Sequence, residues 1–346
     1  TLPRRDALKP RVQTLRRGLA DPRASRAPAT RAAQHDLYAA LVGPAEPLLR
    51  GARRLIVVPD GILALVPFEA LLTRRVGADP EARDYLIHRF AVSYVPSASA
   101  MVARATAAAA DTVVAVANPW FGEAPAASGP GASSGGAPGQ ATMGGSSDED
   151  AQGPALAALP STAMEVASLR VTAGRRPFQV LDGRAATRER LLAALPGADV
   201  VHLATHGDVN ELEPERSGLW LAASDSGSPG RLEAGDVLGM DLRAELVTLS
   251  ACETGLGRLE RGEGVVGLAR AFLASGARSV IVSLWQVNDR STADLMKRFY
   301  GDALGRKRER VTALAEAKRA LLARAETRSP YYWAPFVLIG EAGRLE

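Results

Sequence analysis

Short, nearly continuous apolar runs alternate with helical patterns through the second half of the chain. The runs at 199–205, 246–251 and 279–284 are mostly apolar and show no strict alternation with polar residues, which is typical of strands covered on both faces. Between and around these runs, apolar residues recur at helical spacing, which predicts helices over 161–171, 187–195, 263–274, 292–304 and 311–325. Strands that alternate with helices in this way predict an α/β fold with a mostly parallel central sheet, covered by helices on both faces.

Shorter patterns predict further elements and their ends. Ser161-Thr162 resembles a helix N-cap with Glu165 as its capping-box partner, and Thr187 resembles a second N-cap. Pro196-Gly197 is expected to end the helix that Thr187 begins. Brief apolar runs predict strands at 55–58, 91–95, 112–117, 178–181, 219–222 and, as an edge strand, 336–339.

The chain divides into segments of different character. Residues 1–50 are predicted to be a helical lead. Because the chain begins at Thr1 rather than Met, it is expected to be a piece of a longer protein. Residues 51–121 and 156–346 are predicted to be the N-terminal and C-terminal halves of one domain spanning 51–346. Residues 122–155 are rich in Gly, Ala, Ser and Pro and lack Leu, Ile, Val, Phe, Tyr and Trp, so a disordered insert is expected there.

Composition narrows the class of protein. The sequence contains a single Cys and therefore no internal disulfide, which favours a reducing, cytoplasmic setting. Lys and Arg total 42 against 38 Asp and Glu, and the basic residues are dispersed, so no nucleic-acid partner is expected. Neither a membrane-spanning run nor a signal peptide is visible in the sequence.

Two residues at predicted strand ends carry the candidate chemistry. His206 follows the 199–205 run, and Cys252 follows the 246–251 run. Because the carboxyl ends of parallel strands meet at one edge, both residues are expected at a shared rim, where α/β proteins bind ligands. A thiolate is a strong nucleophile toward an amide carbonyl, and imidazole transfers protons near neutral pH. Gly207 offers a backbone N–H for the oxyanion, and the N–H of Cys252 offers a second.

Each residue also has a structural interpretation. A lone Cys at a strand end is often a small buried hydrophobe, and His206 beside Gly207 is also compatible with a simple turn. His202 lies inside its strand and is interpreted as a hydrogen-bonded core histidine. The sequence has neither a usual zinc-ligand spacing nor a phosphate loop nor a serine-hydrolase elbow, so no metal or cofactor is expected.

Several motifs, in order, resemble the CHAT family of caspase-like peptidases. The similar segments are Val201–Gly207, Leu249–Gly255, Ser283–Asp289, Tyr332–Phe336 and, in the first half, Pro59–Gly61 with Pro67–Glu69. The resemblance covers roughly residues 51–346 without the 122–155 insert. It implies a caspase-like α/β/α sandwich and a Cys–His dyad, which matches Cys252 and His206 by position, with Gly207 at the oxyanion donor. Since CHAT domains commonly follow helical repeats, it also implies an upstream helical-repeat region or a regulatory protein as partner.

The segment Leu284–Asp289 is similar to the stretch that lines the specificity pocket of separases. The match implies that Asp289 faces a basic side chain, although Gln286 stands where separases often have Asp. An alternative role for Asp289 is to cap the helix that follows. Glu253 and Asp208 are weaker candidates for the pocket, and Trp285 is interpreted equally well as core or as subsite wall.

The expected function is therefore that of a cysteine endopeptidase that cleaves a protein or peptide after a basic residue, in a defence or cell-death type of pathway. Two alternatives remain open at this point. One is a catalytically silent interaction module gated by a partner. The other is a cysteine acyltransferase or amidase acting on small molecules.

Overall fold

The computed structural model describes most of the chain. The described residues are 4–75, 84–97, 111–121, 156, 158–210, 212–223, 230–250, 252–253, 263–287 and 289–345. The predicted insert at 122–155 lies outside these ranges, as does the Gly-rich stretch after Glu253. Among the described residues, no helix is both long and apolar enough to cross a lipid bilayer.

The described strands form a large central sheet and a small second sheet. In the large one the order is β1-β2-β12-β11-β9-β5-β3-β4, and every neighbouring pair is parallel except β12 with β11. Its strands are β1 Arg54–Val57, β2 Ala91–Tyr94, β3 Val113–Pro119, β4 Phe178–Gly183, β5 Val200–Ala204, β9 Leu246–Leu249, β11 Ser279–Ser283 and β12 Phe336–Gly340. The small sheet has the order β10-β6-β7-β8, with β6 His206–Asp208, β7 Gly218–Trp220, β8 Arg231–Glu233 and β10 Cys252–Glu253.

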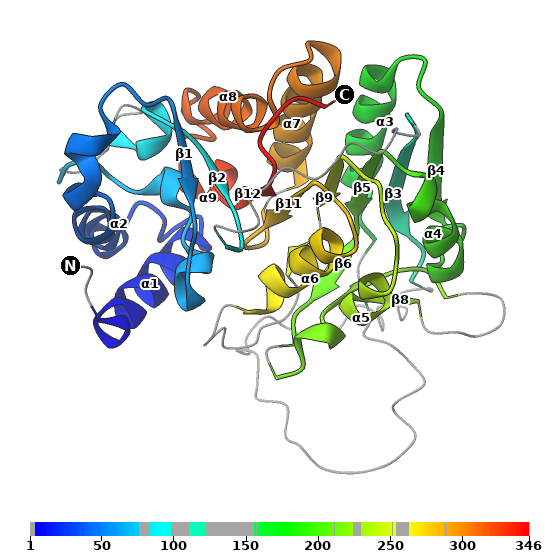
Figure 1. Ribbon diagram of the computed structural model, residues 1–346, viewed down its shortest axis with the longest axis horizontal. Helices are drawn as coiled ribbons and strands as arrows, with labels where there is room; N and C mark the ends of the chain where they lie inside the picture. The colour runs from blue at the N-terminus through cyan, green and yellow to red at the C-terminus, as the bar shows by residue number, and fades with distance from the viewer. Residues whose placement is uncertain are drawn as a thin grey trace, which may run out of the picture.

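Helices cover both faces of the central sheet, which confirms the predicted α/β fold class (Figure 1). On one face lie α3, α7 and α8, and on the other lie α5 and α6 (Figure 1). The helices are α1 Arg5–Leu19, α2 Pro28–Leu41, α3 Ser161–Ala173, α4 Arg188–Ala194, α5 Ala234–Leu238, α6 Glu263–Ala274, α7 Asp289–Tyr300, α8 Arg310–Leu322 and α9 Pro330–Trp333.

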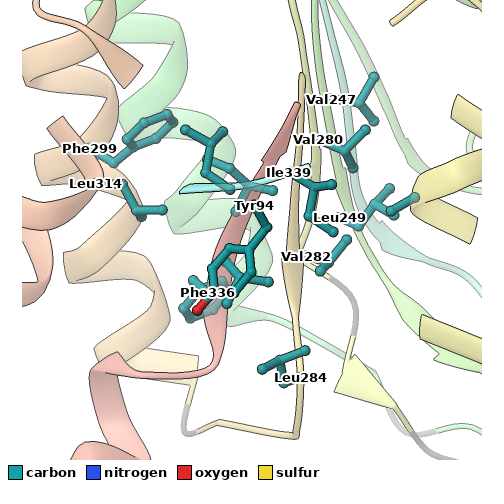
Figure 2. Close-up of a cluster of buried hydrophobic side chains, with 14 of the residues drawn as sticks. Tyr94, Val247, Leu249, Val280, Val282, Leu284, Phe299, Leu314, Phe336 and Ile339 are labelled. Atoms are coloured by element: carbon teal, nitrogen blue, oxygen red, sulfur yellow. The ribbon is translucent and has the colours of Figure 1, made fainter. Parts of the chain in front are cut away.

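The apolar core therefore consists of two layers with the sheet between them. Figure 2 shows the central strands nearly edge-on, with Phe299 and Leu314 on one side and Val247, Leu249 and Val280 on the other. All residues of β5, β9 and β11 are buried, because each strand has helices over both faces. This explains why these strands read as continuous apolar runs rather than as alternating patterns.

The C-terminal strand lies inside the sheet, so the prediction of an edge strand at 336–339 is wrong. β12 pairs with β11 on one side and with β2 on the other. It is the one strand that joins two groups of parallel strands, since its pairing with β11 is antiparallel. A short apolar run specifies burial, but its place in the sheet depends on which partners the rest of the chain supplies.

The expected capping box at the start of α3 does not form. Thr162 donates its hydroxyl to the carbonyl of Leu159, and Glu165 is buried instead of reaching back to the helix start. Its carboxylate accepts a hydrogen bond from Ser250, 85 residues away in sequence. The Thr187 cap is confirmed, because its side chain accepts a hydrogen bond from the backbone N–H of Arg190.

Other predicted bounds hold with local changes. The helix at 263–274 is confirmed by α6. The helix expected at 292–304 starts three residues earlier, as α7, and its last turns widen into a π-helix over Gly301–Gly305. The strand expected at 219–222 is β7 of the small sheet.

The N-terminal helices pack into the same core as the rest of the chain. Leu8, Val12, Leu15 and Leu19 of α1 belong to the buried apolar cluster that includes the central strands, and so does Leu37 of α2. In Figure 1 both helices lie at the end of the molecule near β1. The domain boundary near residue 50 remains a prediction, but the helical lead is not detached from the sheet.

A buried ion pair explains the Pro67-Phe68-Glu69 motif. Glu69 is 2% exposed, and its two carboxylate oxygens bind the ammonium of Lys318 on α8 and the hydroxyl of Tyr94 on β2. Burial lowers the pKa of Lys318, an effect that the charge of Glu69 opposes. The pair thus joins the first half of the chain to a helix near its C-terminus.

Asp199, the residue before β5, is a buried carboxylate with an unusual pKa. One of its oxygens lies 3.1 Å from Nη1 of Arg176, and its backbone carbonyl accepts from the N–H of Glu245 at 2.8 Å. Burial, only partly offset by Arg176, raises the pKa of Asp199 from 3.8 to about 6. Since the folded state holds this proton more tightly than the unfolded state, ionisation of Asp199 lowers stability as the pH rises from about 3.8 to about 6.

We expect Asp199→Asn to stabilise the protein at neutral pH. The amide avoids the cost of burying the charge, so the free energy of unfolding at pH 7.5 should rise by up to about 3 kcal/mol, the value of a two-unit pKa shift. The gain should shrink as the pH falls through 6 toward 4. Urea unfolding of both proteins across this pH range measures it, and a difference that does not change with pH would contradict the assignment.

Candidate active site

His206 and Cys252 occupy paired positions on two adjacent parallel strands. β6 begins at His206 and β10 begins at Cys252, and their register pairs His206 with Cys252 and Gly207 with Glu253. In a sheet, positions directly opposite one another belong to the same face. The two residues singled out by sequence are therefore brought together, although 46 positions (252 − 206) separate them in the chain.

The central sheet determines this pairing. β5 and β9 are parallel neighbours in which Leu203 pairs with Leu249. Past the end of each strand, the backbone N–H of Ser250 still donates to the carbonyl of Leu203, at 2.9 Å. His206 lies three residues after Leu203, and Cys252 lies three residues after Leu249 (206 − 203 = 3 and 252 − 249 = 3). Because the two spacings are equal, the register of the large sheet continues into the small one.

An aromatic ring that the sequence analysis missed lies against His206. Phe121, two residues beyond β3, has its ring centroid 5.4 Å from that of the imidazole, with the rings tilted by 51°. His206 is 6% exposed, and β3 lies beside β5 in the sheet. The signal available in the sequence was an aromatic residue just past a predicted strand end, but only the strand order reveals which strand end it adjoins.

On the other side of β6, the small sheet is held by an ion pair. Asp208 accepts a hydrogen bond of 2.6 Å from Arg231 on β8, whose guanidinium carbon lies 5.2 Å from the centre of the Trp220 ring. Burial raises the pKa of the Asp208 carboxyl, and the charge of Arg231 opposes this shift. Asp208 thus links β6 to β8 across the intervening strand β7, which weakens its case as a recognition group for a basic substrate.

The Leu284–Asp289 segment begins at the same edge of the sheet. β11 lies beside β9, with Val282 paired to Leu249, and the segment continues from the end of β11. Trp285 is 3% exposed and donates its indole N–H to the carbonyl of Tyr331 at 3.1 Å, so it is a core residue. Asp289 is the first residue of α7, and Gln286 is exposed.

Helix α1 also contacts this segment. Nη2 of Arg16 donates to the carbonyl oxygen of Leu284 at 3.1 Å. The helical lead therefore contacts Leu284, the first residue of the segment that resembles the separase specificity pocket.

The prediction that His202 is a hydrogen-bonded core histidine is confirmed. It is fully buried, and its Nδ1 lies 3.0 Å from the hydroxyl oxygen of Tyr300. Among the described residues, no group of three or more His, Cys, Asp or Glu is arranged to hold a metal ion.

Most of the chain matches the model of one protein family. A model of the CHAT domain matches residues 31–341 of the chain. The chain belongs to the CHAT domain family. The match begins within α2, so it includes part of the helical lead as well as the region expected from the motifs.

Curated relatives of this CHAT domain are much longer proteins. Tetratricopeptide repeat protein 28 of Homo sapiens is 27% identical over 363 residues, which cover 89% of this chain and 13% of that protein. Tetratricopeptide repeat protein 28 of Mus musculus is 29% identical over 224 residues, covering 54% of this chain and 9% of that protein. The chain thus spans only a small part of the length of these relatives.

Two solved structures have a fold similar to that of this chain. Gingipain R, named as an Arg-specific cysteine proteinase, superposes with a TM-score of 0.53 at 10% identity and covers 98% of this chain and 75% of its own. The separase of Saccharomyces cerevisiae, in its complex with securin, superposes with a TM-score of 0.50 at 13% identity. The match covers 84% of this chain and 15% of the separase chain. At these identities the likeness shows the fold alone, and it confirms that this CHAT domain has the caspase-like fold expected from its sequence.

A designed disulfide tests the pairing of His206 with Cys252. Since Cys252 is the only Cys, His206→Cys should form one bond with it under mild oxidation, because neighbouring strands bring paired Cα atoms within the range of about 4.4–6.8 Å that a disulfide spans. A mass decrease of two hydrogen atoms in the intact protein and protection of both thiols from alkylation measure the bond. Gly207→Cys, which pairs with Glu253 instead, is the matched control and should cross-link far more slowly; equal rates would contradict the register.

Proposed function

We propose that this CHAT domain is a cysteine endopeptidase with Cys252 as nucleophile and His206 as proton carrier. The observation that supports the proposal is the parallel pairing of these two residues at the carboxyl edge of the central strands. The caspase-like fold, shared with a separase and with gingipain R, which is named as a cysteine proteinase, adds support at the level of the superfamily. No residue of the dyad needs a metal or a cofactor for this chemistry.

The reaction has two halves. In the first, His206 takes the proton of the Cys252 thiol, and the thiolate attacks the peptide carbonyl to form a C–S bond. His206 then donates that proton to the amine nitrogen as the C–N bond breaks. In the second, His206 takes a proton from water as the water oxygen attacks the thioester carbon. His206 returns this proton to the Cys252 sulfur as the C–S bond breaks and the acid is released. The backbone N–H groups of Gly207 and Cys252 are the proposed donors to the oxyanion in both halves.

The proposed preference is for a basic residue before the cleaved bond, through Asp289. Three observations support this: the segment carrying Asp289 begins beside the Cys252 strand, the motif resembles that of separases, and a structural neighbour is named as Arg-specific. A carboxylate selects a guanidinium or ammonium group by charge-assisted hydrogen bonds. With Asp208 bound to Arg231, Asp289 is the better candidate for this role.

The proposed setting is a cytoplasmic protein whose upstream helical-repeat region or regulatory partner controls cleavage of a protein substrate in a defence or cell-death type of pathway. Its curated relatives are tetratricopeptide repeat proteins, and the separase neighbour is in complex with securin. The contact of Arg16 with Leu284 also supports an alternative, a catalytically silent module in which the helical lead controls a binding surface.

We expect Cys252→Ala to abolish cleavage of Arg-containing peptides, with a loss of at least about 10³-fold in kcat because the acyl-enzyme cannot form. Fluorogenic peptides with Arg before the leaving group measure it, and circular dichroism checks folding. Cleavage at the wild-type rate would end the proposal.

Two further measurements separate the alternatives. Labelling of Cys252 by a peptide electrophile would exclude the catalytically silent module. Turnover of small amides without preference for peptides would favour an acyltransferase or amidase.

We expect Asp289→Asn to weaken the preference for Arg while sparing the chemistry. The amide keeps a similar shape but loses the charge, so kcat/KM for Arg peptides should fall by about 10- to 100-fold, mostly through KM. A peptide with Gln in place of Arg serves as the matched substrate, and its cleavage should change little. An equal loss for both peptides would assign Asp289 to the start of α7 rather than to the pocket.

A further inference from the structure

Five buried polar side chains form a closed ring beneath His206 and Cys252. They come from two strands and two helices: Thr248 and Ser250 from β9 and its end, His202 from β5, Glu165 from α3 and Tyr300 from α7. All five are less than 9% exposed, and each contacts another member of the group. We refer to them as the polar ring.

The contacts run continuously around the ring. Tyr300 donates its hydroxyl to Thr248 at 2.8 Å, and its oxygen lies 3.0 Å from Nδ1 of His202. On the other side of the imidazole, Nε2 lies 3.2 Å from a carboxylate oxygen of Glu165, a close polar contact without the alignment of a hydrogen bond. The same Glu165 oxygen accepts from the hydroxyl of Ser250 at 2.8 Å, which returns the ring to the strand where it began.

The position of the ring relates it to the candidate dyad. Ser250 lies two residues before Cys252, and His202 lies four residues before His206. Glu165 therefore contacts both strands just before each delivers its candidate residue to the rim. The paired positions His202 and Thr248 face the same helix layer, where Tyr300 contacts both.

Polar groups at this place have no advantage for stability alone. Well-packed apolar side chains often stabilise a core as well as a buried polar cluster does or better, whereas directional contacts select one arrangement of the elements that carry them. Apolar contacts between α3 and the strands tolerate small displacements, whereas the hydrogen bonds of Ser250 to Glu165 and of Tyr300 to Thr248 depend on distance and angle. A displacement of about 1 Å is enough to reduce an enzyme rate by about 10²-fold.

We infer that the polar ring, through Glu165, is a positioning device that holds the strand ends of His206 and Cys252 at their working separation. The inference rests on the proposed function, since that function gives the separation its importance. Glu165 and its partners act through the two strands and are positioning residues rather than catalytic ones.

The test measures strand separation directly, without requiring activity. In the His206→Cys background, adding Glu165→Ala should slow disulfide formation with Cys252 by about tenfold, because the two strand ends are no longer held together. Glu165→Gln retains an oxygen acceptor for Ser250 and should restore most of the rate. Tyr300→Phe, which opens the ring on its other side, should give an intermediate rate.

A matched control separates positioning from general destabilisation. Glu69→Gln alters another buried carboxylate, in the pair with Lys318, and should leave the disulfide rate unchanged. With His206 intact, Glu165→Ala should lower kcat for peptide cleavage by about tenfold with little change in KM, and Glu165→Gln should recover it.

A folded Glu165→Ala protein with the unaltered disulfide rate would overturn the inference, and should that variant fail to fold, an unaltered rate in Tyr300→Phe would do so. Failure of the proposed function looks different: the wild-type protein would cleave no peptide, while the disulfide rates would still respond to Glu165.

Discussion

The parallel pairing of β5 with β9 is the constraint on which the candidate site depends. Both strands are buried on both faces and matched residue for residue from Val200–Leu246 to Leu203–Leu249. Backbone ladders of this kind fix the relative position of two chains to within one residue, because a slip would move every side chain to the opposite face. The same register continues in the small sheet, where it pairs His206 with Cys252.

The groups that stabilise the fold and the groups near His206 and Cys252 lie in different parts of the structure. The apolar layers on the two faces of the sheet supply the bulk of the burial, and the Glu69–Lys318 and Asp199–Arg176 pairs join distant parts of the chain at points away from the rim. The rim itself receives an aromatic ring from β3, an ion-paired hairpin from β7 and β8, and the Leu284 segment from β11. Each comes from a different strand end, which is the usual way in which α/β sheets build sites.

The polar ring lies between these two parts of the structure. Its members are buried in the core, yet Ser250 precedes Cys252 by two positions and His202 precedes His206 by four. Glu165 illustrates how a local interpretation is overridden: its spacing from Ser161 and Thr162 is that of a capping box, but burial against β5 and β9 gives its carboxylate better partners than an exposed helix end does. At the start of α3, Thr162 instead donates its hydroxyl to the carbonyl of Leu159.

The sequence alone determined the α/β class, most element bounds and the two strand-end residues, because periodicity and burial are local properties that each segment carries in its own side chains. It also determined that His202 is a core residue. The tertiary structure decided everything that depends on which segments become neighbours: β12 inside the sheet rather than at its edge, Phe121 against His206, and Glu165 between two strands. Strand order and long-range contacts arise from the packing of the whole chain, so no single segment encodes them.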